Sequence, residues 1–215
     1  MAAPFRLQLG DSAPRQQSAT TCGSSCLTVA RMLVNPAFAQ WITRGIGKDA
    51  RDPGVPVVPD GRTPTERFAA YEQVVAGRTN AVLGAGGRLQ PPWPRALGTP
   101  PWGVSNELEY GASDPEADYD LRWIRLADQR RLERVYAELQ GRVRDGRPAA
   151  LYIGNAWAPR HVVLVMPATA GELDVYEPSI GQVVDLPREA FVTQRLMMAG
   201  WDVPWALVWA DSGPR

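Results

Sequence analysis

The stretch QQSATTCGSSCL, residues 16–27, decides how this chain is interpreted. Gln16 precedes Cys22 by six residues, and the periodicity that follows predicts a helix that begins at Cys22 with Thr21 as its N-cap. A helix N-terminus favours negative charge, and a glutamine amide can donate a hydrogen bond to an oxyanion. We therefore interpret Cys22, among small polar neighbours, as an accessible nucleophile and Gln16 as its oxyanion stabiliser. The predicted helix carries one apolar stripe, which consists of Cys26, Leu27, Ala30 and Leu33. Because Cys26 belongs to this stripe, we predict that it has a packing role.

The composition excludes several classes of function. Lys and Arg number 23 and so do Asp and Glu, so no charge excess favours nucleic acid or an anionic membrane as a partner. No apolar run approaches a membrane span, and the start of the chain lacks the apolar core of a secretory signal. We expect a cytoplasmic protein, or one exported without such a signal. Two cysteines four residues apart and a single histidine make neither a disulfide framework nor a zinc site, so no metal or cofactor is expected.

The predicted elements place helices ahead of a mainly antiparallel sheet. Helices are predicted at 22–34, 37–43 and 64–76, and another follows Asp128 and ends at Asp145-Gly146. Strands are predicted at 121–126, 149–153, 161–166, 173–176, 182–185 and 206–210, with a helical turn at 187–193. This order indicates the α+β class, in a chain whose length suits one domain, residues 1–215.

Residues 35–120 are predicted to be a helical and Pro/Gly/Trp-rich insertion within that domain. The sequence Thr63-Pro64-Thr65-Glu66 has the form of a capping box, which supports the helix after it. Residues 49–63 and 84–118 are interpreted as loops because Pro and Gly interrupt them repeatedly. The longer loop is either a surface excursion held by its own tryptophans or a rim that binds substrate.

His161 is the only histidine in the chain and opens the apolar run HVVLVM, residues 161–166. A strand that begins there would fix the backbone and present the imidazole from the edge of the core. Beside a thiol at a helix start, this residue is predicted to be the general base.

A third group must orient the imidazole, and the following hairpin offers two carboxylates. Alternation along the strand puts Glu177 on the face of Val175, whereas Asp174 shares the other face with Tyr176. Glu177 ends its strand and can lie beside the start of the His161 strand, so it is the predicted partner and Asp174 the weaker one. A solvated carboxylate at a hairpin end is the alternative without function.

With these residues the chain resembles the bacteriocin-processing, double-glycine leader peptidases, a branch of the papain-like cysteine peptidases. In that family a Gln lies six positions before the nucleophilic Cys, whose Cys-Gly opens a helix. The N-terminal matches are Gln16, Cys22-Gly23, Leu27 and Met32-Leu33. The region from Pro148 to Trp209 is similar to the C-terminal half of the family, with His161 as its base, Glu177-Pro178 at its Asp-Pro and Gly181 at the glycine after it.

The resemblance implies a papain-like fold, in which a helix carrying the nucleophile packs on a mainly antiparallel sheet. It covers residues 14–34 and 146–210, and it departs from the family at Glu177, where the side chain is one methylene longer than Asp. The segment between Cys22 and His161 is longer than the family usually has. We expect that segment to determine substrate specificity.

Three functions are compatible with these residues. The favoured one is a cysteine peptidase that cleaves a peptide or protein substrate through a thioester. The same site in a papain-like effector or toxin would instead deamidate or transglutaminate protein glutamine, which shares the first half-reaction. A catalytically silent papain-like binding module is the third. Lys48 is the only lysine, which is typical of a GC-rich genome, although a toxin that avoids lysine modification in a host would show it too.

Overall fold

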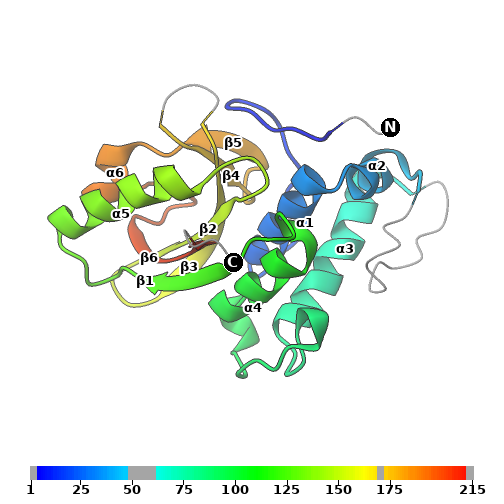
Figure 1. The fold of residues 1–215 in the computed structure, drawn as a ribbon, viewed down its shortest axis with the longest axis horizontal. Coiled ribbons are helices and arrows are strands. Elements are labelled where there is room, and N and C mark those ends of the chain that lie inside the picture. The colour runs from blue at the N-terminus through cyan, green and yellow to red at the C-terminus, as the bar shows by residue number, and fades with distance from the viewer. Residues whose placement is uncertain (1–3, 48–61, 169–171, 212–215) are drawn as a thin grey trace.

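The computed structural model describes residues 4–47, 62–168 and 172–211. Helices α1 and α4 pack on one face of a six-stranded antiparallel sheet, α2 and α3 pack against α1, and α5 and α6 cover the other face (Figure 1). The protein therefore belongs to the α+β class. Among the described helices, none combines the length and the apolar character that a membrane span requires.

The helices are α1 (Cys22–Val34), α2 (Pro36–Arg44), α3 (Pro64–Thr79), α4 (Pro101–Glu107), α5 (Gln129–Arg142) and α6 (Arg188–Val192). Three short helical turns, η1 (Ala85–Gly87), η2 (Arg95–Leu97) and η3 (Leu108–Ala112), flank α4. The strands are β1 (Tyr119–Trp123), β2 (Ala149–Gly154), β3 (Pro159–Met166), β4 (Asp174–Glu177), β5 (Gln182–Asp185) and β6 (Val203–Ala210), in the sheet order β1-β6-β2-β3-β4-β5.

Helix α1 begins at Cys22 as predicted, but its burial differs from the prediction. All residues from Cys22 to Met32 are buried, the polar Ser24, Ser25 and Thr28 included, whereas Leu33 is only half-buried. The one-sided stripe was wrong because α3 and η3 pack against α1 in addition to β3. Helix α1 is therefore the centre of its layer rather than an amphipathic cover on the sheet.

Local capping chemistry determines the two helices that the sequence predicted best. The Thr63 N–H donates to Glu66 Oε2 at 2.9 Å and the Thr63 hydroxyl accepts from the Glu66 N–H, so the capping box forms at the start of α3. Asp128 Oδ1 accepts from the Arg131 N–H at 2.8 Å at the start of α5. That helix ends at Arg142, short of the predicted Asp145-Gly146, because the backbone at residue 143 is already extended.

The largest departure from the prediction lies in residues 84–118, where α4 and η3 form within a predicted loop. Pro101 occupies the first turn of α4, where a helix does not need its N–H group. Val104, Leu108 and Ala112 then bury their side chains in the core beside α1. The predicted loop at 49–63 lies outside the described residues except for its last two positions.

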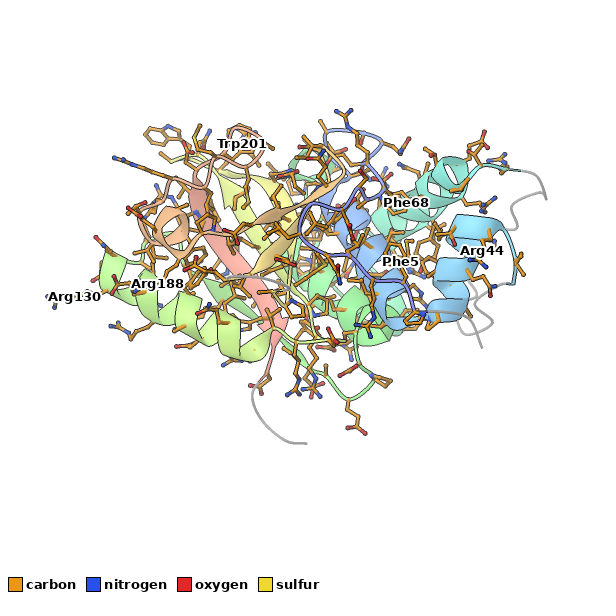
Figure 2. All side chains as sticks on the ribbon, turned by 90° about the horizontal axis from the view of Figure 1, so that it is seen from above. Phe5, Arg44, Phe68, Arg130, Arg188 and Trp201 are labelled. Atoms are coloured by element: carbon orange, nitrogen blue, oxygen red, sulfur yellow. The ribbon has the colours of Figure 1, made fainter. Side chains whose placement is uncertain are left out.

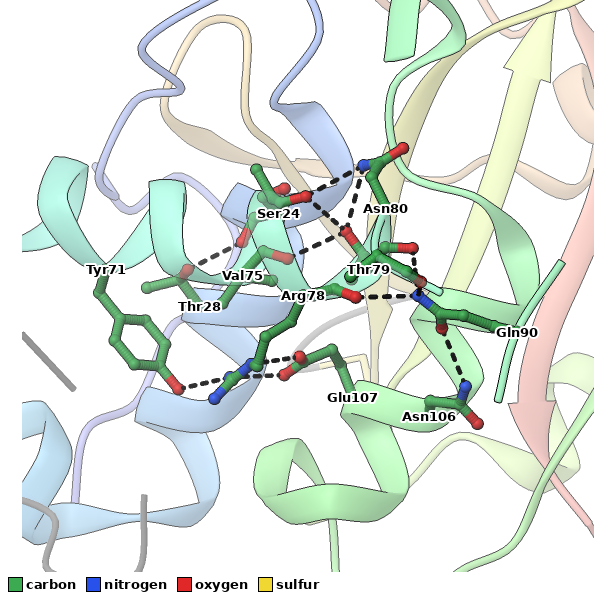
Figure 3. A network of polar contacts seen from close by, with 12 residues as sticks. Ser24, Thr28, Tyr71, Val75, Arg78, Thr79, Asn80, Gln90, Asn106 and Glu107 are labelled. Carbon is green, nitrogen blue, oxygen red and sulfur yellow. Dashed lines mark hydrogen bonds and ion pairs between the residues drawn. The ribbon is translucent and has the colours of Figure 1, made fainter. Parts of the chain in front are cut away.

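Polar contacts join α3 to α4 and to the loop between them (Figure 3). Gln90 Nε2 donates to the carbonyls of Arg78 and Thr79 at the end of α3, both at 2.8 Å. The Arg78 guanidinium donates to both oxygens of the buried Glu107 carboxylate, at 2.7 and 2.8 Å. These bonds fix the helical layer against which the first turn of α1 packs.

The N-terminal segment follows the edge of the sheet. Its backbone exchanges hydrogen bonds with β5 and the preceding turn, from Gly10 N to Val183 O and from Ala13 N to Gly181 O. Phe5 of the same segment and Phe68 of α3 line one cavity (Figure 2). The segment thus leads the chain from the helical layer along the sheet edge to Gln16.

Candidate active site

Cys22 is the first residue of α1, so the unpaired N–H groups of the first turn surround its position. Thr21 occupies the N-cap position as predicted, but its hydroxyl donates to the Ser18 carbonyl at 3.1 Å and caps no N–H group of the helix. Those N–H groups therefore receive no side-chain oxygen from Thr21, which favours a negative charge at the helix start.

The expected accessibility of Cys22 was wrong, since only 3% of the residue is exposed. The loop before α4 lies directly on the first turn of α1. A Cβ at position 23 would come within 2.6 Å of Thr99 Cβ, so this approach depends on Gly23. The Thr99 carbonyl in turn accepts from the Tyr152 hydroxyl of β2 at 2.8 Å, which anchors the loop across to the sheet.

His161 and Glu177 are brought together by adjacent antiparallel strands. Val165 lies opposite Val175 and Leu164 opposite Tyr176, so the start of β3, which carries His161, and the end of β4, which carries Glu177, lie at the same end of the sheet. His161 Nε2 lies 2.7 Å from Glu177 Oε1, with 5% and 2% of the two residues exposed. A solvated position for Glu177 is thereby excluded.

The Cys22 thiol is a second hydrogen-bond partner of the His161 imidazole. Burial lowers the pKa of His161, but hydrogen bonds to Cys22 and Glu177 outweigh it and raise the pKa to about 9. Burial raises the pKa of Glu177, yet hydrogen bonds from His161 and Ser179 bring it below its ordinary value. Because Glu177 engages Nε2, Nδ1 is the imidazole nitrogen left for Cys22. The arrangement favours a charged imidazole between two acidic groups.

Asp174, the weaker candidate, lies away from His161. It faces Met166, at the far end of β3, and its side chain belongs to the opposite face of β4 from Glu177. Asp174 thus lies at the other end of the strand pair from His161, and only Glu177 reaches the imidazole.

Gln16 lies next to this site through its backbone, whose N–H donates to the Pro178 carbonyl at 2.9 Å. Its side-chain Nε2 donates to the Ser18 carbonyl at 2.8 Å, and its Oε1 is buried without a hydrogen-bond partner. Exchanging the two amide atoms would set oxygen against the Ser18 carbonyl, so the amide must rotate before it can donate toward Cys22. Its role as oxyanion stabiliser stays a prediction.

Cys26 has the packing role predicted for it. The residue is 1% exposed, its Sγ donates to the Val162 carbonyl at 3.4 Å, and burial raises the pKa of its thiol well above the ordinary value. In the described ranges, no group of three or more His, Cys, Asp or Glu side chains is arranged to hold a metal ion.

Two residues of the insertion, Thr99 and Glu72, contact the first turn of α1 and were missed by the sequence reasoning. Nothing near either in the sequence identifies them, because their positions depend on how the insertion packs. The tryptophans of the loop pack on each other instead, with Trp93 and Trp102 ring centroids 5.0 Å apart and Trp102 Nε1 donating to the Pro91 carbonyl. The loop is thus held by its own tryptophans while its end reaches the site.

Comparison with known proteins identifies no family for this chain. Neither protein-family models nor curated protein sequences match it. Among solved structures, the chain is similar to the crystal structure of the Pseudomonas avirulence protein AvrPphB, with a TM-score of 0.48 and 11% sequence identity. That similarity covers 95% of this chain and 98% of the AvrPphB chain.

Proposed function

We propose that this chain is a papain-like cysteine peptidase in which Cys22 is the nucleophile, His161 the general base and Glu177 the group that orients the imidazole. The observation that carries the proposal is the contact of His161 Nε2 with Glu177 Oε1 at 2.7 Å, together with the hydrogen bond between His161 and Cys22. A thiol, an imidazole and a carboxylate linked in this order form the arrangement that thiol acyl transfer needs.

The proposed reaction has two half-reactions. Cys22 sulfur attacks the carbonyl carbon of a peptide bond, and the proton held on His161 passes to the leaving amine as the C–N bond breaks. Water then attacks the thioester, His161 takes a proton from that water, and the C–S bond breaks to release a carboxylate. The N–H groups at the start of α1, with the rotated Gln16 amide, would stabilise the oxyanion in both steps.

A cleavage assay with Cys22→Ala and Cys26→Ala tests the nucleophile. The purified chain is incubated with a library of peptides, the products are weighed by mass spectrometry, and cleavage should occur in wild type and Cys26→Ala but vanish in Cys22→Ala. Replacing the base, as in His161→Ala, should lower kcat by about 10²- to 10⁴-fold.

Two further measurements separate this proposal from its alternatives. A thiol alkylator at mildly acidic pH should modify Cys22, which hydrogen-bonds to His161, and spare Cys26, whose thiol pKa is raised well above its ordinary value. Equal modification of both, or of neither, would contradict an activated Cys22. A gain of about one dalton on a glutamine peptide without cleavage would assign deamidation instead, since an amide becomes an acid. Neither cleavage nor mass gain from any peptide, with Cys22 unreactive, would leave the binding module.

A further inference from the structure

Glu72 is a fully buried carboxylate of α3 that the proposed reaction does not use. Its Oε1 accepts hydrogen bonds from the Ser25 hydroxyl and from the Gln17 N–H, the latter at 3.3 Å. The Thr21 hydroxyl lies close to the same carboxyl group. Glu72 therefore contacts residues on both sides of Cys22 and the residue that follows Gln16.

The same contacts extend to the strand that carries Glu177. The Tyr176 hydroxyl lies beside Ser25 and donates to the Pro14 carbonyl at 2.5 Å. One polar chain thus runs from α3 through the first turn of α1 to the residue beside Glu177, and it returns to the segment before Gln16. Four parts of the candidate site meet on it.

Burying a carboxylate is unfavourable unless its oxygens are hydrogen-bonded, and here burial raises the pKa of Glu72. Glu72 Oε2 is buried with no hydrogen-bond partner, so the free-energy cost of removing it from water is not offset. Packing alone would therefore not favour a carboxylate at this position. What a carboxylate provides here is an acceptor that several donors of the Gln17–Ser25 segment can share.

We infer that Glu72 is a positioning residue. It holds the Gln16–Cys22 segment against the first turn of α1, so that the Cys22 thiol stays beside the imidazole of His161. The inference rests on the proposed function, and it gives the insertion a part in the active site besides the specificity expected of it. Glu72 acts through the hydrogen bonds that it accepts from Gln17 and Ser25 and makes no contact with the reacting carbonyl.

The test compares Glu72→Ala and Glu72→Gln with Glu66→Ala, a matched change in the first turn of the same helix. Glu66 belongs to the capping box of α3, so its replacement weakens the helix without touching the Gln17–Ser25 segment. In Glu72→Ala, kcat should fall by about 10- to 100-fold while KM changes by less than about twofold. Glu72→Gln keeps an acceptor oxygen and should restore most of kcat, and Glu66→Ala should leave kcat unchanged.

The second readout needs no peptidase activity. Burial, Cys22 and Glu177 set the pKa of His161, so a thiol that leaves its place should lower that pKa. NMR of the single imidazole should show this shift in Glu72→Ala and a smaller one in Ser25→Ala, which removes one hydroxyl and is milder for folding. Glu66→Ala and Glu72→Gln should titrate like wild type.

The possible outcomes distinguish the positioning role of Glu72 from the peptidase proposal. A folded Glu72→Ala whose kcat and His161 titration both match wild type would overturn the positioning role, whatever its loss of stability. Equal effects of Glu72→Ala and Glu66→Ala would also overturn it, because they would report only a weaker helix. If no substrate is cleaved by wild type but Glu72→Ala still shifts the His161 titration, the peptidase proposal fails and the positioning of Cys22 by Glu72 stands.

Discussion

At the scale of single residues, the charge state of His161 connects the geometry of the site to something measurable. The chain has one histidine, so one imidazole signal reports on the site without assignment by mutation. We expect this signal to titrate with a midpoint near pH 9 in wild type, because the hydrogen bonds to Cys22 and Glu177 outweigh burial. Cys22→Ala and Glu177→Gln should each lower the midpoint, and Asp174→Asn, on the opposite face of β4, should not.

The same titration has a consequence for stability. The pKa of His161 is about 9 in the folded chain and about 6.5 in an unfolded one, so its contribution to the free energy of unfolding is complete below about pH 6.5 and is lost as pH rises through about 9. The pKa of Glu177 is lowered on folding, so its contribution is present above about pH 4.3 and is lost as pH falls through the lower folded value. Urea unfolding should therefore give a lower free energy at pH 9 than at pH 6, with a smaller difference in Cys22→Ala. A free energy that rises with pH over this range would contradict the charged imidazole.

At the scale of elements, the contact between the loop before α4 and the start of α1 decides how deeply Cys22 is buried. Gly23→Ala would set a Cβ 2.6 Å from Thr99 Cβ and 2.7 Å from its Oγ1, so one side chain must move. We expect Gly23→Ala to lower the free energy of unfolding by about 1–3 kcal/mol, as overpacking of a core does. Thr99→Gly removes every one of those contacting atoms.

A double-mutant cycle on these two positions measures the contact directly. If the clash with Thr99 is the cause, Gly23→Ala should cost less in the Thr99→Gly background, with a coupling free energy of about 0.5–3 kcal/mol from urea unfolding. Additive losses would show that position 23 is sensitive for another reason. Alkylation of Cys22 in Thr99→Gly alone should also become faster, because the loop would shield the first turn of α1 less.

The sequence predicted those elements whose start signals lie within a few residues of them, and it missed those that depend on long-range packing. Helices α3 and α5 were predictable because Thr63 with Glu66, and Asp128, carry their start signals within four residues. The pairing of His161 with Glu177 was predictable because the start of one strand lies beside the end of the next in an antiparallel pair. Nothing local predicted α4, whose prolines look like loop residues until Val104 and Leu108 are seen to pack on α1.

The burial of Cys22 and the role of Glu72 lay beyond sequence reasoning for the same reason. Small polar neighbours predict exposure of a thiol when only its own helix is considered, and Gly23 has the same appearance whether it faces water or Thr99. Glu72 lies 50 residues beyond Cys22, and a single glutamate in a helix is usually a solvated charge when only the sequence is considered. Long-range packing of the insertion decides both positions.

At the scale of the whole molecule, the sheet separates two hydrophobic clusters that lie on its opposite faces. One cluster contains α1, α3 and the residues of η3, and the other contains α5 and α6. The strands contribute alternate side chains to each, as Val162 and Leu164 do on the α1 face and Val163 and Val165 on the other. We propose that residues 1–215, the insertion 35–120 included, fold as a single domain.

Matched core truncations on the two faces test this. Leu108 of η3 and Leu139 of α5 are both fully buried, one in each cluster. Leu108→Ala and Leu139→Ala should each lower the free energy of unfolding by about 2–5 kcal/mol. In a single domain, far-UV circular dichroism and tryptophan fluorescence should give one coincident urea transition in wild type and in both variants. A second transition that appears only in Leu108→Ala would show that the insertion unfolds on its own, and Glu72 would then hold Cys22 from a separate unit rather than from the shared core.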